Sequence, residues 1–480
     1  MKKAFRMPLV AVAASLAMVA VGVTPAFAGA PSESSVLANA LVVKHAPSSA
    51  LNMGGSSFDA NLVNAAYAQW KTYSNTNGAS LNAYASSSSG TGRGNVINGT
   101  DAIGFTDVPL NYAGQDTSSL SSWIQTPVAL GGVAIINNIA YQTSDKVSNA
   151  FGTATTSPVT ANGTSSGQSC SSLAKQYPVA LDGKTLGSVF AGSITSWGNA
   201  AIQADNPRLS VLVKVPVAKA IPAKGKKGHK GYRKAVPQKN RLEAVNCLTL
   251  TTTPAITVYS RTAGSGTTFI FRDYLSKVDP SEYPYPSSAA FTSATSTFSG
   301  SSTLAPAVAL KDGSIGYVEY GYALLNHLAS LRLKNAAGAY VSLNAGSVAI
   351  AATAGLAAIQ ANKSACPNGF DVTAGTTNTY NGSTISTTCF SINNVNNLGA
   401  YPIAGFSYAV APQHISDANT GIVTTKFLLF LTQTSSSASQ PYGQNLAASE
   451  AYVALPKPIE AIAYAAISHI NSGAYISASN

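Results

Sequence analysis

The stretch from Ile256 to Leu275 constrains the fold and function of this chain more than any other. A short run typical of a β-strand, Ile256 to Tyr259, leads into the polar turn RTAGSGTT, and an apolar helical pattern begins at Phe269. Glycines in the turn allow the backbone to approach a ligand closely. The first turn of a helix offers unpartnered N–H groups and partial positive charge. Together with the guanidinium of Arg261 and the hydroxyls of the turn, these groups predict a site for a small oxyanion.

The turn alone is equally consistent with an ordinary strand-to-helix connection capped by Ser or Thr, so the rest of the chain must decide. Two similar turns occur earlier. GGSSF (residues 54–58) precedes an amphipathic helix, and SSSSGTGR (residues 86–93) follows a predicted strand at 81–84, with another helix expected to begin near Val96. Strands are also expected at 101–110 and 126–137. This alternation predicts α/β layers with parallel strands, which bind ligands at their carboxyl ends.

The first 28 residues are predicted to be a secretory signal peptide. Basic residues precede an apolar run from Pro8 to Val23, and Ala26-Phe27-Ala28 forms a small-x-small cleavage pattern before Gly29. The run is short for an uncleaved membrane anchor, no cysteine marks a lipid anchor at the cleavage point, and no later run is apolar enough to cross a bilayer. We therefore expect an exported protein that is periplasmic, or extracellular and associated with the cell wall.

An even number of cysteines in an exported chain predicts disulfides. The four are Cys170, Cys247, Cys366 and Cys389, and none lies in a CxxC motif or near a histidine cluster. Metal binding is therefore not expected. Of the three possible connectivities, nearest-neighbour pairing is favoured, which joins Cys170 to Cys247 and Cys366 to Cys389.

The excess positive charge is concentrated in one segment. The formal net charge is +11, and it falls to +8 once the three cations of the signal peptide are removed. Ten Lys and Arg residues, with no Asp or Glu, lie between Lys214 and Arg241, where glycines and prolines predict an exposed loop. Such a loop could attract anions or acidic polymers. A solvated insertion without specific function is the favoured interpretation, and nucleic-acid binding is not expected.

The order of the motifs is similar to that of a known family. GGSSF, GFTDVPL, LDGKTLGSVFAGSITSW, SRTAGSGTTFIFRDYL and GSIGYVEYGYA together resemble the phosphate-binding proteins of bacterial ABC phosphate importers, over roughly residues 52–470. The resemblance implies a two-lobed periplasmic-binding-protein fold of type II, an α/β fold in which each lobe is a mixed sheet flanked by helices. Crossing segments would be Thr126–Asn137 and Phe406–Ala411, and closure around the ligand would be a hinge motion.

The resemblance also implies a division of the chain. A leader (29–50) would precede lobe 1, made of residues 51–130 and 405–480, and lobe 2 would comprise residues 131–404. Insertions are expected in lobe 2 at about 143–178, 214–241 and 361–396, the last closed by Cys366 and Cys389.

Carried over position by position, the resemblance implies eight phosphate ligands that supply hydroxyls, backbone amides, one carboxylate and one guanidinium. They are Ser57, Phe58, Ser89, Asp107, Arg261, Ser265, Gly266 and Thr267. The chain departs from the family at Ala263, where an acidic residue that can pair with the arginine is often found. Arg261 is therefore expected to lack a neighbour that restrains it and shares its charge.

Asp107 is the most informative of these residues. An ionised carboxylate only accepts hydrogen bonds, so it repels an anion unless that anion has a proton to donate. Phosphate at neutral pH has such a proton and sulfate does not. Asp107 is therefore expected to exclude sulfate by an unpaired contact between like charges, at a cost of a few kcal/mol, or roughly a hundredfold in affinity.

The resemblance implies a non-enzymatic, monomeric receptor without cofactors, whose partners are inorganic phosphate and the permease subunits of an ABC transporter. Three alternatives stay open: a secreted phosphatase or esterase, a scaffold that has kept the fold and lost the ligand, and a receptor for another oxyanion such as arsenate. Against an enzyme, the five histidines are scattered and no GxSxG or HExxH motif is present.

Overall fold

The computed structural model describes most of the chain. The described residues are 41, 43, 47–72, 80–113, 122–139, 141–143, 156–159, 179–206, 209–218, 222–236, 239–250, 255–366, 369–370, 387–437, 439 and 441–476. The predicted signal peptide, most of the predicted leader, and Cys170 lie outside them. In the part of the chain that is described, no helix is long and apolar enough to cross a membrane.

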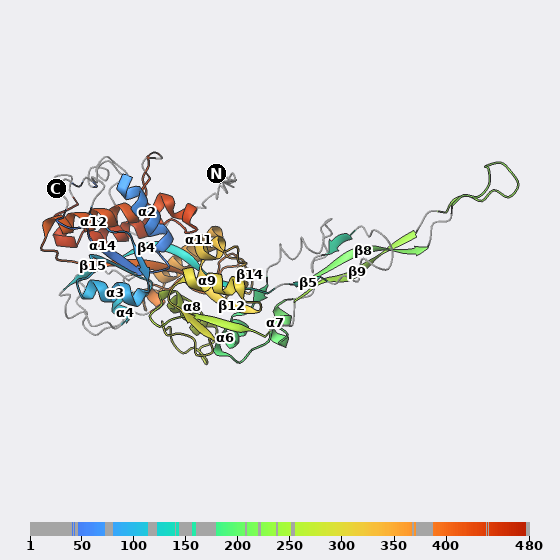
Figure 1. The fold of residues 1–480 in the computed structure, drawn as a ribbon, viewed down its shortest axis with the longest axis horizontal. Helices are drawn as coiled ribbons and strands as arrows, with labels where there is room; N and C mark the ends of the chain where they lie inside the picture. The colour runs from blue at the N-terminus through green and yellow to red at the C-terminus, as the bar shows by residue number, and fades with distance from the viewer. Residues whose placement is uncertain are drawn as a thin grey trace.

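An eight-stranded mixed sheet forms the centre of the molecule, in the order β11-β10-β12-β4-β15-β3-β1-β2 (Figure 1). Its middle strands, β4 (Trp123–Asn137) and β15 (Ala404–Pro412), run antiparallel to each other. Parallel strands lie on either side of this pair: β1 (Met53–Ser56), β2 (Ala85–Ser87) and β3 (Ile103–Thr106) on one, and β10 (Thr257–Arg261), β11 (Ser296–Phe298) and β12 (Ser314–Glu319) on the other.

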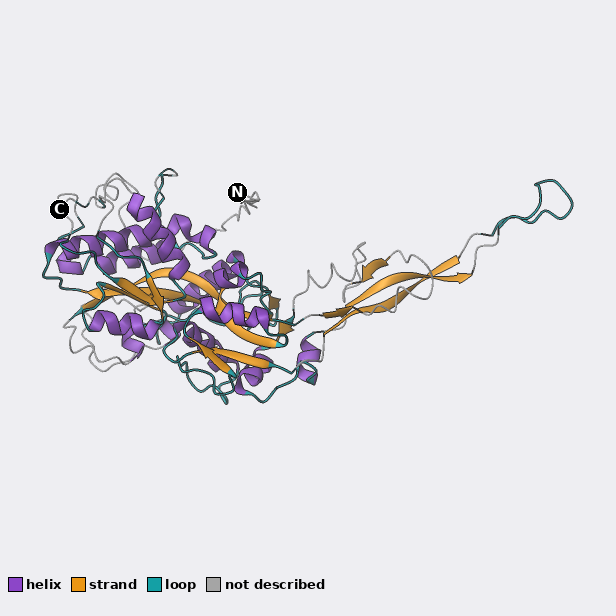
Figure 2. Ribbon diagram, viewed as in Figure 1, coloured by secondary structure: helices purple, strands orange, loops and turns teal. Residues whose placement is uncertain are grey.

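The long apolar sequence of β4 has a structural reason. All of its residues are buried, because helices cover the sheet on both faces (Figure 2). Both segments predicted to cross between lobes are strands and are central in the sheet, as expected. The boundaries of the two lobes stay a prediction.

Helices connect and cover the strands. They are α2 (Ala60–Thr72), α3 (Ser89–Ile97), α4 (Leu110–Ala113), α6 (Gly183–Ala191), α7 (Ala200–Asp205), α8 (Gly266–Val278), α9 (Ser301–Leu310), α10 (Tyr320–Leu325), α11 (Ala345–Ala361), α12 (Ala418–Thr432), α13 (Gly443–Leu446) and α14 (Lys457–Ile467), with short 3₁₀ helices at Thr387–Cys389, Ala447–Glu450 and Ile470–Gly473. On the β1-to-β3 side, Trp70 of α2 packs edge-on against Phe427 and Phe430 of α12.

Several boundaries differ from the sequence prediction. The second strand comprises residues 85–87 rather than 81–84, and the helix after it begins at Ser89, so that Val96 lies near its end. Helix α8 begins at Gly266 rather than at Phe269. The cause is the same in both helices: Ser88 and Ser265 cap the helix N-terminus by accepting a backbone N–H, so polar residues form the first turn and the apolar pattern begins later.

A β-sheet arm projects from the body of the molecule (Figure 1). Strands β8 (Leu209–Ala218) and β9 (Lys239–Leu250) pair as a long hairpin, and β5 (Tyr141–Thr143) and β6 (Thr156–Val159) flank it in the order β5-β9-β8-β6. The prediction of an exposed loop at 214–241 therefore holds for residues 222–236 and is wrong at both ends of the segment, where cross-strand hydrogen bonding forms β8 and β9. The predicted insertion at 143–178 is not all loop either, since β6 lies within it.

A small three-stranded sheet, β14-β13-β7, completes the fold, with β7 at Ala180–Leu181, β13 at Arg332–Lys334 and β14 at Tyr340–Val341. The predicted bridge between Cys366 and Cys389 is present, with Cα atoms 5.3 Å apart. Pairing of Cys170 with Cys247 stays a prediction, because Cys170 is outside the described residues.

Candidate functional site

Helix α8 contributes three of the eight predicted ligands from a single turn. Strand β10 ends at Arg261, Gly264 takes a left-handed φ of 88°, and the Ser265 side chain accepts the backbone N–H of Thr268. Gly266 and Thr267 therefore stand in the first turn of the helix, where no preceding helical carbonyl can reach their N–H groups. The turn presents two backbone amides and the Thr267 hydroxyl at one buried point.

The strands of the other half of the sheet, β1, β2 and β3, bring the remaining groups to the same point. Ser57 and Phe58 follow β1 and precede α2, Ser89 opens α3 after β2, and Asp107 follows β3. Strands β1, β2 and β3 are parallel, so their carboxyl ends meet at one edge of the sheet. Each group therefore follows a strand that ends at that edge.

Direct contacts join the residues that follow β1, β2 and β3 to the residues at the end of β10 and the start of α8. Arg261 Nη1 donates to Ser57 Oγ at 2.9 Å and lies 3.5 Å from Thr267 Oγ1. The backbone N–H of Gly90 donates to the carbonyl of Gly264 at 3.0 Å. A Cβ atom added at Gly266 would lie 2.2 Å from Ser89 Oγ and 2.4 Å from an Asp107 oxygen. The structure thus brings all eight predicted residues together in one buried cluster; that they bind phosphate stays a proposal.

Arg261 is held by neutral oxygens. Nη2 donates to the carbonyl of Ser299 at 2.7 Å, Nε donates to the carbonyl of Phe298 at 3.3 Å, and Nη1 donates to Ser301 Oγ at 3.1 Å. Ala263 is exposed and contributes no charge. The expectation that Arg261 would lack a restraining neighbour is therefore wrong, because carbonyls after β11 and a hydroxyl of α9 orient the guanidinium without neutralising it. Its positive charge remains for an anion.

Asp107 is surrounded by hydroxyl donors. Ser56 Oγ donates to Oδ2 at 2.8 Å and Ser407 Oγ lies 2.5 Å from Oδ1, while the Asp107 backbone N–H donates to Ser89 Oγ at 3.0 Å. Burial raises the pKa of Asp107 to about 6, although these hydrogen bonds and Arg261 oppose the shift. The carboxyl is therefore mostly ionised at pH 7 and can accept a hydrogen bond from a protonated anion.

A second carboxyl, Glu319, lies near the arginine at the end of β12. It is almost fully buried, and burial raises its pKa to about 8, against the opposing effects of Ser301 and Arg261. Glu319 is thus mostly protonated at neutral pH and leaves the charge of Arg261 largely uncancelled. Among the described residues, no group of three or more His, Cys, Asp or Glu side chains is arranged to hold a metal ion.

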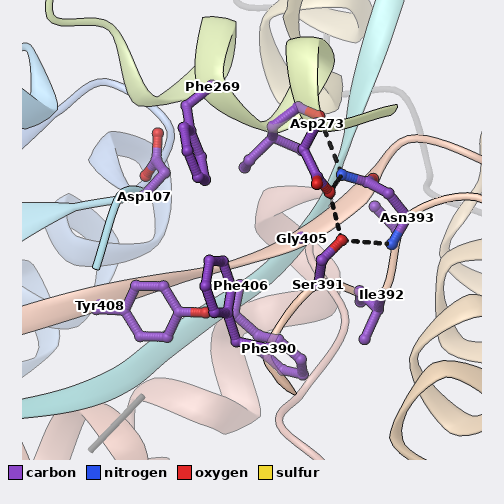
Figure 3. Close-up of a pocket in the computed structure, with 12 residues that line it drawn as sticks. Asp107, Phe269, Asp273, Phe390, Ser391, Ile392, Asn393, Gly405, Phe406 and Tyr408 are labelled. Carbon is purple, nitrogen blue, oxygen red and sulfur yellow. Dashed lines mark hydrogen bonds between the residues drawn. The ribbon is translucent and has the colours of Figure 1, made fainter. Parts of the chain in front are cut away.

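A small cavity adjoins Asp107. It measures about 20 Å³, room for about one water molecule, and Figure 3 shows Asp107 and Asp273 on either side of Phe269 along its wall. Asp273 accepts hydrogen bonds from Asn393, at 2.6 Å, and from Ser391. Aromatic rings and two carboxyls suit an anion poorly, whereas the amides and hydroxyls between Ser57 and Thr267 suit it well.

Sequence analysis missed several residues of this cluster, notably Ser56, Asp59, Ser301, Glu319 and Ser407. Asp59 directly follows GGSSF and Glu319 lies inside GSIGYVEYGYA, so both could have been noticed as acids adjoining the motifs. Ser407 carried no signal beyond its place in a predicted crossing strand, because only strand pairing brings it to Asp107.

Two curated proteins match part of this chain, and both are named as phosphate-binding proteins. The chain is 27% identical over 295 residues to the phosphate-binding protein PstS of Xylella fastidiosa, and 26% identical over 279 residues to PstS of Haemophilus influenzae. These alignments include 59% and 57% of this chain, and only 58% and 60% of the relatives' own lengths. The chain thus spans less than two thirds of the curated relatives that it matches.

A solved structure with a similar fold is that of an ancestral soluble variant of the human phosphate-binding protein. It has a TM-score of 0.50 and 16% sequence identity, and the alignment covers 86% of this chain and 93% of that one. The likeness bears on the fold alone, and it confirms the predicted α/β fold, a mixed sheet flanked by helices. A family model described as a PBP superfamily domain matches residues 42–434, well over half of the chain, and the protein therefore belongs to that superfamily.

Proposed function

We propose that this protein captures inorganic phosphate between the β1-to-β3 half and the β10-to-β12 half of its sheet, and that it delivers the phosphate to an ABC permease. The observation that carries the proposal is the buried carboxyl of Asp107, which lies among the hydroxyls, backbone amides and guanidinium of the cluster. A receptor for a fully deprotonated anion has no use for that carboxylate, whereas phosphate carries a proton for it to accept. The names of the curated relatives support the same ligand.

Arg261 would supply the positive charge, oriented by the carbonyls of Phe298 and Ser299. The amides of Ser57, Gly266 and Thr267, just before α2 and at the start of α8, would donate to the remaining oxygens with help from the helix dipoles. The amide of Phe58, which donates to Ser56 Oγ at 3.0 Å in the ligand-free protein, would turn to the anion on binding. The hydroxyls of Ser57, Ser89 and Thr267 would complete the shell, and Ser265 would hold the turn. Binding would close the two lobes by a hinge motion around β4 and β15.

The proposed role is binding and not catalysis, in an exported monomer. Among the described residues of the cluster, no hydroxyl is paired with a histidine that could act as a base. Transfer to a permease is proposed because the relatives are named for the PstS protein of phosphate import. A fold-retaining scaffold and a secreted phosphatase are the alternatives that the next experiment separates.

Calorimetric titration of the mature protein, freed of bound anion, tests the proposal at pH 7.5. We expect phosphate to bind with a Kd of about 1 μM or tighter, about −8 kcal/mol, and an equal concentration of sulfate to give no heat of binding. Arsenate, which protonates as phosphate does, should compete. A folded sample that ignores both phosphate and sulfate would contradict the proposal and favour the scaffold, whereas release of phosphate from an ester would favour the enzyme.

A further inference from the structure

A single hydroxyl connects two buried carboxyl groups in the cluster. Ser407 Oγ, on β15, lies 2.5 Å from Asp107 Oδ1 and 2.8 Å from Asp59 Oδ2. Strand register explains the meeting: Tyr408 pairs with Thr106 in the antiparallel β15–β3 ladder, which sets Ser407 opposite Asp107. Both carboxyls are buried, Asp59 completely.

Counting protons shows that the two carboxyls cannot both be ionised in this arrangement. A serine hydroxyl has one proton to donate, and an ionised carboxylate has none. Two oxygen–oxygen contacts of hydrogen-bond length around Ser407 therefore need a second proton, carried by Asp59 or by Asp107. One acid must donate to Ser407, which then donates to the other.

The surroundings identify Asp59 as the acid that carries this proton. Asp107 receives further hydrogen bonds and attraction from Arg261, which favour its ionised form, whereas Asp59 Oδ1 has no hydrogen-bond partner. Burial and repulsion from the carboxylate of Asp107 raise the pKa of Asp59 well above the ordinary value, against the opposing hydrogen bond with Ser407. The carboxyl of Glu319 adds to this rise when it is ionised.

Two tyrosines complete the surroundings of Asp59. Tyr84 donates to the carbonyl of Ser56 at 2.6 Å, and Tyr452 donates to the carbonyl of Phe58. Burial raises the pKa of both phenols well above the ordinary value, so both are neutral. Neither tyrosine offsets a negative charge on Asp59.

We propose that Asp59 is the protonated end of a hydrogen-bond relay, Asp59–Ser407–Asp107, that keeps Asp107 ionised and oriented toward the bound anion. Asp59 donates to Ser407 Oγ, and the Ser407 proton points to Asp107 Oδ1. Asp59 is then a positioning residue for phosphate selectivity, although it does not touch the ligand. The role in selectivity rests on the proposed function; the protonation of Asp59 does not.

Replacing Asp59 by Asn tests the protonation without any ligand. An amide can donate to Ser407 as the neutral acid does, but it does not titrate. In the wild type, the raised pKa of Asp59 stabilises the fold below the pKa of the unfolded chain, about 3.9, and this contribution is lost as pH rises toward the folded value. Urea midpoints should therefore match near pH 4, and the Asp59→Asn variant should become progressively more stable than the wild type up to pH 8.

Asp312→Asn, a change at an exposed aspartate, is the control and should show no such divergence. A stability difference between wild type and Asp59→Asn that does not change with pH would overturn the relay.

Phosphate titration at pH 7.5 tests the positioning role. We expect Asp59→Asn to keep the wild-type Kd within about threefold, whereas Ser407→Ala, which removes the donor to Asp107, should weaken binding about tenfold. A loss in Asp59→Asn as large as that in Asp107→Asn would show that Asp59 acts as a charged group and would overturn the inference. If the wild type itself does not bind phosphate, the proposed function fails, and the urea measurement still decides whether the relay exists.

A second, independent observation concerns the tip of the arm, residues 222–236. It carries six Lys or Arg residues and no acidic residue, all six cations are exposed, and its backbone makes two successive tight turns. In these turns the N–H of His229 bonds to the carbonyl of Lys226 and that of Tyr232 to the carbonyl of His229, with φ of 93° at both Gly228 and Gly231. This basic segment thus lies at the far end of the arm, away from the rest of the molecule (Figure 1).

We infer that this tip binds a linear polyanion, an acidic polymer outside the cell. Its charge complements such a polymer, and a polymer chain can follow a narrow hairpin end. A membrane is less suitable, because the tip offers little apolar surface: Tyr232 is half-buried and Val236 is 44% exposed.

Binding to dextran sulfate and to phosphatidylglycerol vesicles tests this inference on the full mature protein. Replacing Lys224, Lys226, Lys227 and Lys230 by Gln should weaken dextran sulfate binding about tenfold or more and reduce its salt dependence. The matched control replaces four exposed lysines of the body, Lys71, Lys184, Lys311 and Lys363, and should bind almost as the wild type does. Equal losses in both variants, or stronger binding to vesicles than to the polymer, would overturn the inference.

Discussion

Replacing Arg261 by Ala should weaken phosphate binding by about a hundredfold or more. The guanidinium is the cation of the cluster that contacts Ser57 and Thr267, and it is about 1% exposed. Loss of one partner from a buried, charged contact typically costs about 2–5 kcal/mol, and about 3 kcal/mol corresponds to roughly a hundredfold in Kd. Titration of the variant with phosphate at pH 7.5 measures the loss directly.

Arg261→Lys should recover only part of the affinity. Lysine keeps the charge, but it cannot reproduce the planar set of donors that meets the Ser299 and Phe298 carbonyls and Ser57 together. Arg272→Met is the matched control, because Arg272 is on α8, the helix that follows Arg261, but lies over the ring of Phe291, 4.4 Å from its centroid, and outside the cluster. Phosphate affinity that survives in Arg261→Ala, or that falls equally in Arg272→Met, would argue against the proposed site.

Replacing Asp107 by Asn should change the selectivity between phosphate and sulfate by about a hundredfold or more. The amide no longer repels a fully deprotonated anion, and its Nδ2 can donate to a sulfate oxygen. Phosphate at the same time loses the acceptor for its proton. We expect weaker phosphate binding together with measurable sulfate binding, read by titration and by competition between the two anions at pH 7.5.

At low pH the wild type should also bind sulfate. Because burial raises the pKa of Asp107 to about 6 in the ligand-free protein, lowering the pH through that value protonates the carboxyl, which then donates instead of repelling. Sulfate binding should therefore appear in the wild type near pH 5 and be absent at pH 7.5. Asp273→Asn, a change at a buried acid across the neighbouring cavity, should leave selectivity unchanged. Sulfate binding that is equally weak in Asp107→Asn and the wild type at pH 7.5 would refute this account of selectivity.

Local sequence was sufficient to predict which residues gather in the buried cluster, because the turns that carry them are short and contiguous. Each predicted ligand lies in or beside a polar turn next to a strand, and the carboxyl ends of parallel strands necessarily meet at one edge. The long apolar runs that became β4 and β15 were recognisable for a related reason: a strand buried on both faces has few polar residues. Helix starts were less accurate, since capping residues belong to the first turn but interrupt the apolar pattern.

Only the tertiary structure decided which groups orient those ligands. Ser407 and Asp59 are 348 positions apart, and Arg261 meets Ser57 across 204 positions, so no periodicity or spacing reveals either contact. Strand register places Ser407 opposite Asp107, and β11 and α9 supply the oxygens that hold Arg261. Pairing of β8 with β9 also made strands of the two ends of a basic segment whose composition is typical of a loop. Sequence thus determined which chemical groups the cluster contains, whereas long-range pairing decided how those groups are oriented toward one another.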